Sequence, residues 1–398
     1  MRSGVQGFVG TKLAEARQAR GITSRKALAD LMQRAASTVI RWEEGDTSPE
    51  PAALGELAKF LAVPEDFFLS PRLDDGGQIF FRSFQGALKG ERLVQKVRLL
   101  WLEDIAAVAE HYAFLPEINV PDLSNGQNFK TFRVEDIEAF AFKLREHWSL
   151  GQRPIPDMIA LLESKGVIVG SEPMETTQLD GLSRWGVDGR PYVLLASDKQ
   201  SFARRQFDAA HELAHLVLHR GVSAAEIEEN LKTIEDQAHR FASAFLLPES
   251  QFAVEFGSIT LWELERQKVR WRVSIKAQIM RLQRLGMLDT SLATKLYKAY
   301  SAKGYQSKGE PYDDVWPLQQ PSMLSDVFRA LIDSGRITKE ALRLDLPLYP
   351  HDVESLTGLP AGWLTLETAR IVTLRAELKP RRSGENGLGN VFHFPTKS

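Results

Sequence analysis

The sequence predicts a mostly helical α+β protein made of several domains. Its 398 residues exceed one ordinary domain, and at about 100–200 residues per domain the length predicts two to four. Helical periodicity dominates both ends of the chain, whereas short apolar strand-like runs are confined to the middle. We therefore expect a five-helix N-terminal domain, an α+β core with a small antiparallel sheet, and a helical C-terminal region.

The composition narrows the class of protein. With 43% hydrophobic and 26% charged residues the chain is globular, and it has no apolar run long enough to span a membrane. The first residues lack the apolar core of a secretion signal, so we expect a cytoplasmic protein. Because cysteine is absent, thiol catalysis and cysteine-bound zinc are excluded, and any metal must be held by His, Asp or Glu.

Charge is distributed unevenly although the net charge is only −2. Residues 1–42 carry eight basic and two acidic side chains, a net charge of +6, and residues 43–66 carry a net charge of −6. A second basic stretch, residues 265–284, has seven basic side chains and one acidic side chain. Such segregation allows a local basic surface for phosphates, although charge runs are usually solvated faces.

The pattern of the first 65 residues predicts short amphipathic helices. The first covers residues 12–17 and stops before Gly21, and the second follows the capping hydroxyls of residues 23 and 24. The third covers residues 36–43 and ends at Gly45, and a fourth covers residues 52–61 after Pro49. On the third, Val39 and Trp42 are expected to face inward, which leaves Ser37, Ile40 and Arg41 outward. Short polar and Arg side chains on such a face suit major-groove readout.

The run LADLMQRAASTVIRWEEGDTSPEPAALGELAKFLAVPEDFF, residues 28–68, resembles the XRE or Cro/repressor-type helix-turn-helix. The resemblance implies a double-stranded DNA operator and a homodimer. The DNA contacts that it implies are a phosphate contact from Arg25 and contacts from the third helix by Ala36, Ser37, Thr38 and Arg41. The family usually has Gly between the two helices, where this chain has Gln33. The alternative is an ordinary three-helix cap without DNA binding.

A helical connector and a second compact unit follow. Helices are expected at residues 134–149 and 157–165, and strands at 166–170, 181–185 and 191–196. We divide the chain into a DNA-binding domain (1–72), a connector (73–131), a core domain (132–315), a helical C-terminal domain (316–378) and a disordered tail (379–398). The core domain ends with a helix-turn-helix-like pair at 261–286, whose positive charge is either a solvated face or a DNA contact.

A metal-ligating motif lies in the core domain. Residues 211–215 read H-E-x-x-H, and on a helix His211 and His215 lie one turn apart on one face. Both imidazoles can then reach one Zn²⁺, and Glu212 is placed to take a proton from an activated water. The motif lies in an apolar helix, where three polar side chains would be costly without a cation. The alternative is a pair of hydrogen-bonded core histidines.

A catalytic zinc needs a third protein ligand. Without cysteine, several downstream side chains are candidates. They are Glu226, Glu228, Glu229, Glu235, Asp236 and His239. Glu235 and His239 share one face of an amphipathic helix expected at 235–248, so His239 is either the rival ligand or a neighbour of the ligand.

The runs SFARRQFDAAHELAHLVLH and EDQAHRFASAFLLP resemble the ImmA/IrrE family of zinc metallopeptidases, which have a zincin-like α+β core. The resemblance implies that His211, His215 and Glu235 bind the metal, that Glu212 is the catalytic base, and that His239 lies behind the ligands. The metal is then Zn²⁺ or another divalent ion such as Mn²⁺. Two positions depart from the family: Ala214 replaces a common Gly, and His239 replaces a common Asn. His219 is expected outside the ligand set.

This resemblance implies a transcriptional regulator with an HExxH endopeptidase domain that cleaves a repressor protein, itself of helix-turn-helix type. The alternative is a non-catalytic repressor or antitoxin-type regulator whose metal-site domain only binds a partner or signal; a third possibility is hydrolysis of another amide. The strand at 191–196 is expected to be an edge strand that pairs with an extended peptide. Arg190 and Tyr192 are possible donors to the transition state.

Overall fold

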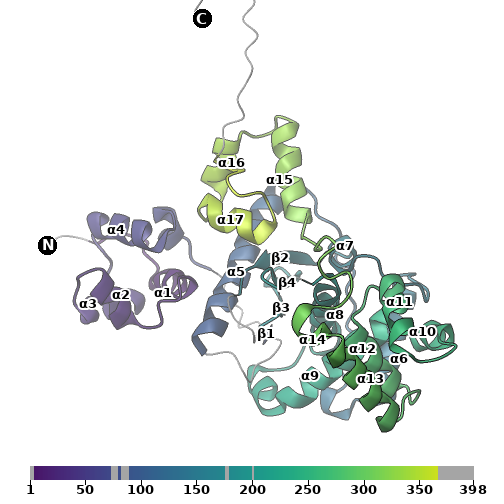
Figure 1. The fold of residues 1–398 in the computed structure, drawn as a ribbon. Helices are drawn as coiled ribbons and strands as arrows, with labels where there is room; N and C mark the ends of the chain where they lie inside the picture. Colours follow the sequence, from purple (N-terminus) through teal and green to yellow (C-terminus); the bar gives the residue numbers. More distant parts are fainter. Residues whose placement is uncertain (1–3, 73–78, 82–88, 175–178, 200, 366–398) are drawn as a thin grey trace, which may run out of the picture. The chain divides into compact units, whose positions relative to one another are not determined.

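The computed structural model describes residues 4–72, 79–81, 89–174, 179–199 and 201–365 (Figure 1). Helices dominate these residues and one small sheet is present, which confirms the mostly helical α+β fold class. The last part of the expected helical C-terminal domain, residues 366–378, and the tail expected from 379 lie outside the described residues. No helix in the described ranges is both long and apolar enough to cross a bilayer.

The N-terminal region contains four α-helices followed by a 3₁₀ helix. They are α1 (Gly10–Ala19), α2 (Arg25–Leu31), α3 (Ala36–Glu43), α4 (Pro51–Leu61) and η1 (Glu65–Leu69). The fifth helix is therefore a short 3₁₀ segment, which follows Pro64 and anchors buried Phe67 and Phe68. Ser24 caps α2 by accepting a hydrogen bond from the N–H of Ala27.

The link between α2 and α3 explains the departure at Gln33. Its φ of 52° lies in the left-handed region, where an L-residue costs more than glycine. The family's preference for glycine at this position thus has a backbone cause. Gln33 keeps the same turn at some cost in stability.

The sheet has four strands in the order β1-β3-β4-β2: β1 (Phe80–Phe81), β2 (Ile168–Glu172), β3 (Gly181–Trp185) and β4 (Pro191–Ala196). It is mixed, because β3 and β4 form an antiparallel hairpin while β2 pairs in parallel with the other side of β4. The expectation of a wholly antiparallel sheet was therefore wrong. The expectation that β4 is an edge strand was also wrong, since β4 is paired on both sides and wholly buried.

The two faces of the sheet pack against different helices. Tyr192 and Leu194 of β4 face the core that includes Leu102 of α5 (Lys89–Tyr112). The alternate residues Val193 and Leu195 face the core that contains α8 (Phe202–Leu218). Figure 1 shows α5 and α8 on opposite sides of the strands. Strand periodicity thus assigns alternate residues of β3 and β4 to the α8 side.

Helices before and after α8 complete the core domain. They are η2 (Phe129–Thr131), α6 (Val134–His147), α7 (Met158–Ser164), α9 (Ala224–Leu246), α10 (Glu249–Phe252), η3 (Ala253–Glu255), α11 (Leu261–Trp271), α12 (Ile275–Arg284), α13 (Thr290–Ala302) and α14 (Tyr305–Lys308). Helix α9 begins eleven residues before the expected position 235, because Ser223 and Glu226 form a capping box; the backbone is non-helical at Asn230. The C-terminal helices are α15 (Met323–Asp333), α16 (Lys339–Asp345) and α17 (Pro350–Thr357).

Candidate metal centre

Helix α8 carries the H-E-x-x-H motif through the interior of the core domain. Ser201 caps it by accepting a hydrogen bond from the N–H of Arg204, and every residue from 208 to 218 is buried. His211, Glu212 and His215 have no solvent-exposed surface. Burial of three polar side chains on one helix requires partners in the interior.

The metal-facing atoms of three side chains converge. The Nε2 atoms of His211 and His215 lie 3.1 Å apart, and the two carboxylate oxygens of Glu235 on α9 lie 3.4 Å from His211 Nε2 and 3.4 Å from His215 Nε2. Two ligands about 2.1 Å from a tetrahedral zinc are about 3.4 Å apart. The three side chains therefore fit a four-coordinate ion and leave one position open.

Protonation states also suit a cation. Burial lowers the pKa of His211 well below its ordinary value, so its imidazole is neutral. Burial alone would raise the pKa of Glu235, but the neighbouring rings of His211 and His215 outweigh that effect and lower it. A neutral imidazole and an ionised carboxylate are the forms in which these side chains bind metals.

The outward nitrogens of the two histidines meet two further histidines. His215 Nδ1 lies 3.1 Å from Nδ1 of His219, which is fully buried, and His211 Nδ1 lies 3.2 Å from Nδ1 of His239. His211, Glu235 and His239 also offer ligand atoms that lie within 4.8 Å of one another, so His239 belongs to the same cluster. Its Nδ1 faces the side of His211 opposite the Nε2 atom that meets His215 and Glu235.

The other carboxylates considered as third ligands lie elsewhere. Glu226 accepts hydrogen bonds from the N–H and Oγ of Ser223 at the start of α9, and Asp236 is exposed and pairs with Arg240. Glu228 and Glu229 are exposed. Of the downstream carboxylates considered, only Glu235 places one oxygen 3.4 Å from His211 Nε2 and the other 3.4 Å from His215 Nε2.

Strand β3 forms the surroundings of Glu212. Ser183 Oγ, fully buried, donates a hydrogen bond of 2.7 Å to Glu212 Oε2. A Cβ atom at Gly181 would lie 2.9 Å from Glu212 Oε1, so glycine leaves the room that this carboxylate occupies. Neither residue was expected from the sequence, because no local pattern links a strand at 181–185 to a helix position some thirty residues later.

The residues expected to stabilise a transition state do not face α8. Tyr192 belongs to the opposite face of β4, and its hydroxyl donates to Asp188 at 2.6 Å. Arg190 donates to Glu110 and to the carbonyl oxygens of Pro116 and Gly166. Both suggestions for these two side chains were therefore wrong.

Comparison with known families matches two segments of the chain. Residues 162–283 match a peptidase family described as the IrrE N-terminal-like domain, and residues 13–68 match a helix-turn-helix family. The chain joins a helix-turn-helix to an IrrE-like domain. None of the curated proteins in the comparison matches it. The matched segments contain most of α1 and all of α2–α4, α8 and α9, which confirms the predicted fusion and indicates a divalent-metal peptidase-like domain.

In the helix-turn-helix domain, α3 presents the expected outward side chains. Ser37 and Arg41 are exposed, Ala36 and Thr38 are half-buried, and Val39 and Trp42 are buried. Arg25 is already paired: its Nε lies 2.8 Å from Glu43 and its Nη1 lies 2.9 Å from Glu44. A phosphate contact by Arg25 would therefore compete with these two carboxylates.

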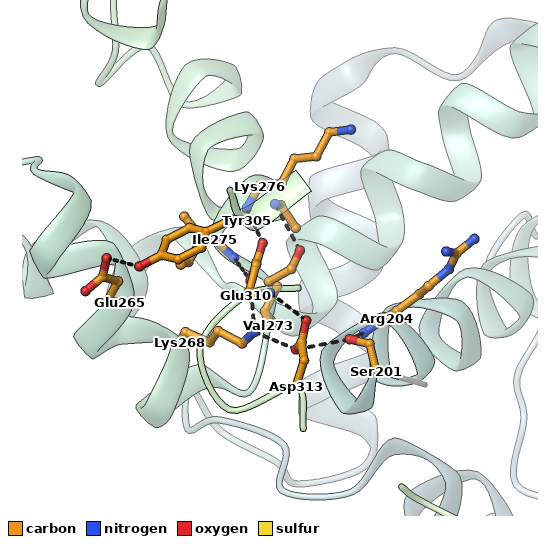
Figure 2. A network of polar contacts seen from close by, with 12 residues as sticks. Ser201, Arg204, Glu265, Lys268, Val273, Ile275, Lys276, Tyr305, Glu310 and Asp313 are labelled. Atoms are coloured by element: carbon orange, nitrogen blue, oxygen red, sulfur yellow. Dashed lines mark hydrogen bonds and ion pairs between the residues drawn. The ribbon is translucent and has the colours of Figure 1, made fainter. Parts of the chain in front are cut away.

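The second basic stretch of the IrrE-like domain is partly internal. Lys268 is fully buried, and its Nζ donates to Glu310 at 2.9 Å and to Asp313 at 2.7 Å (Figure 2). Glu310 also accepts the backbone N–H groups of Ile275 and Lys276, at the start of α12. Fully buried Arg281 pairs with Glu138. Lys268 and Arg281 are therefore neither part of a solvated face nor able to contact DNA, because both side chains are buried in ion pairs.

Proposed function

We propose that this protein is a transcriptional regulator that binds operator DNA through its helix-turn-helix and cleaves a repressor protein with a zinc-dependent IrrE-like domain. The observation that carries the proposal is the convergence of His211 Nε2, His215 Nε2 and the Glu235 carboxylate beside buried Glu212. Their separations match a tetrahedral zinc with one open position, which is the arrangement of catalytic rather than structural zinc sites.

The residues have separable roles in peptide hydrolysis. A metal held by His211, His215 and Glu235 would supply an activated water and polarise the scissile carbonyl. Glu212 accepts the proton of the attacking water and passes it to the leaving amine. Ser183 donates to Glu212 Oε2 and so holds the carboxylate in one orientation. Because Glu212 is buried, this proton transfer is shielded from bulk water.

The DNA-binding half of the proposal rests on α3. Exposed Arg41 and Ser37 lie on the outward face of a helix whose opposite face is buried, and short polar and Arg side chains suit base readout. We expect a homodimer on two half-sites, as such domains use. Arg41→Ala should weaken binding to the specific operator by about 1–3 kcal/mol, measured by anisotropy at fixed salt. Lys59→Ala, exposed on α4, is the control.

The decisive experiment is a cleavage assay with candidate helix-turn-helix repressors, analysed by mass spectrometry with and without added zinc. The unsubstituted chain should produce one zinc-dependent cut, and Glu212→Gln should abolish it while still binding stoichiometric zinc. Glu249→Gln, an exposed glutamate of α10, should cleave normally. Unchanged cleavage by the Glu212→Gln protein would exclude Glu212 as the base. Unchanged regulation by a variant that no longer cleaves would favour a regulator that only binds its partner.

A further inference from the structure

The outer edge of β3 is covered by a segment of the connector. Strand β1 is antiparallel to β3, with Phe80 opposite Ser183 and Phe81 opposite Leu182. Strand β3 is also the strand that brings Gly181 and Ser183 to Glu212. Among the described residues, the edge of the strand nearest the candidate catalytic base is therefore paired by Phe80 and Phe81, which precede the IrrE-like domain in sequence.

The side chain of Phe80 reaches the candidate metal ligands. Residues directly opposite in an antiparallel pair project to the same face of a sheet, and Ser183 faces Glu212. The Phe80 ring stacks on the imidazole of His215, with centroids 5.0 Å apart and planes 8° from parallel. It is only 3% exposed. Phe80 therefore fills space directly beside the metal-ligating ring.

The pocket around Phe80 is apolar. The ring belongs to a small cluster, separate from the main cores, with Phe129 and with three aliphatic residues at and before α9: Val222, Ile227 and Ile234. His219 lies on the same side, its ring centroid 6.0 Å from that of Phe80. A pocket of this composition takes a phenylalanine or another large apolar side chain.

An endopeptidase must hold its substrate extended, and pairing with an exposed strand edge is a common way to do so: backbone hydrogen bonds supply affinity and side-chain pockets supply specificity. We propose that β1 occupies the substrate groove of the IrrE-like domain. A substrate binds in its place, antiparallel to β3, with a large apolar side chain in the pocket of Phe129, Val222, Ile227 and Ile234. This inference rests on the proposed function, and it makes the resting chain self-inhibited.

The energetics favour an exchangeable strand. A tethered segment competes at an effective concentration on the order of millimolar. Even a strand with weak intrinsic affinity can therefore exclude a peptide from the groove when the peptide in solution is much more dilute. In the described part of β1, the buried ring of Phe80 is the side chain that packs beside the metal-ligating histidines, so it contributes strongly to the hold of this strand. Removing that ring should free the groove for a peptide in solution.

The test measures binding rather than cleavage, in a Glu212→Gln background, so a failed peptidase would not obscure it. The probe is a fluorescein-labelled peptide QIFFRS, identical to residues 78–83. Phe80→Ala should bind it at least about tenfold more tightly than the otherwise unsubstituted protein. Phe114→Ala, which removes a fully exposed phenylalanine of the connector, should leave the affinity unchanged. The peptide QIAFRS should bind Phe80→Ala no more tightly than the parent.

A disulfide provides an independent arm, because the chain has no cysteine of its own. Phe81→Cys with Leu182→Cys joins opposite positions of β1 and β3. The oxidised protein should bind no peptide, and dithiothreitol should restore binding. Equal peptide affinity in the oxidised and reduced forms, or equal affinity of Phe80→Ala for both peptides, would overturn the proposal and leave β1 as an ordinary part of the core.

Discussion

The histidines of the candidate centre are oriented through their second ring nitrogens. If His215 meets the metal through Nε2, its Nδ1 carries the proton and donates to His219 Nδ1. His219 Nε2 then donates to Gln237 Oε1 at 2.9 Å, and Gln237 Nε2 donates to the carbonyl oxygen of Phe129 at 2.7 Å. Burial lowers the pKa of His219 to about 3, so this ring is neutral and can accept.

Replacing His219 should therefore weaken zinc binding without removing a ligand. We expect His219→Phe to lower zinc affinity by about 10–100-fold, because the His215 ring loses the partner that fixes its tautomer and orientation. Competition with a chromophoric chelator measures this. His351→Phe, at an exposed position on α17, is the matched control and should have no effect. Unchanged affinity in His219→Phe would show that packing alone orients His215.

A second single-residue prediction concerns the turn of the helix-turn-helix. Gln33→Gly should stabilise the protein by about 1 kcal/mol, because glycine adopts the left-handed conformation of this position without strain. Thermal unfolding followed by circular dichroism measures the shift. The same substitution inside a helix, Gln18→Gly in α1, should instead destabilise by about 1 kcal/mol. A loss of stability in both variants would contradict the backbone argument.

Among the elements, the loop around Glu310 joins three helices. Ser201, the N-cap of α8, donates to Asp313; Lys268 of α11 pairs with Asp313 and Glu310; and Glu310 accepts two N–H groups of α12 (Figure 2). The helix that carries the metal ligands is thereby connected to the helical pair that follows it. Because Lys268 is fully buried, this ion pair is not weakened by solvent.

Lys268→Met should destabilise the fold by about 3–5 kcal/mol, since it leaves two carboxylates without their buried cation. Chemical denaturation measures the loss. Arg266→Met on the same helix removes an exposed partner of Glu263 and should cost no more than about 1 kcal/mol. Similar small losses in the two variants would mean that backbone N–H groups alone satisfy Glu310.

The elements that could be predicted from the sequence are those specified locally. The bounds of α3, β3 and β4 matched the expected ranges, because caps, turns and periodicity lie within each segment. The shared helix face of His211 and His215 is equally local. Strand partners are not specified locally. The apolar run of β4 fits an interior strand as well as an edge strand, and the parallel pairing of β2 depends on distant residues. Ser183 and Gly181 reach Glu212 only because β3, paired with β4, packs one face against α8.

For the molecule as a whole, stability should depend on pH through Glu163 of α7. Its carboxylate accepts the N–H groups of Ser322 and Met323, each at 3.0 Å. Burial outweighs these hydrogen bonds and raises the pKa of Glu163 to about 7. Between pH 4.5 and 7 the folded protein therefore holds a proton that the unfolded chain has released. This contribution is fully present below about pH 4.5 and is lost as the pH rises to 7.

Glu163→Gln keeps an oxygen that can accept both N–H groups but cannot ionise. The variant should gain stability relative to the parent as the pH rises from 4.5 to 8, by at most about 3 kcal/mol. Denaturation midpoints across that range measure the difference. Glu249→Gln, exposed on α10, should track the parent at every pH. A constant difference between Glu163→Gln and the parent would show that Glu163 ionises equally in both states.

The glycine at position 181 has a consequence for how such proteins can diverge. A methyl group there would lie 2.9 Å from Glu212 Oε1 and displace the carboxylate, yet it would not touch the convergence of His211, His215 and Glu235 or the outward face of α3. If the proposed function holds, Gly181→Ala alone would disturb the catalytic base and leave the metal ligands in place, turning a cleaving regulator into one that only binds metal. The outward face of α3 would be unchanged by this substitution.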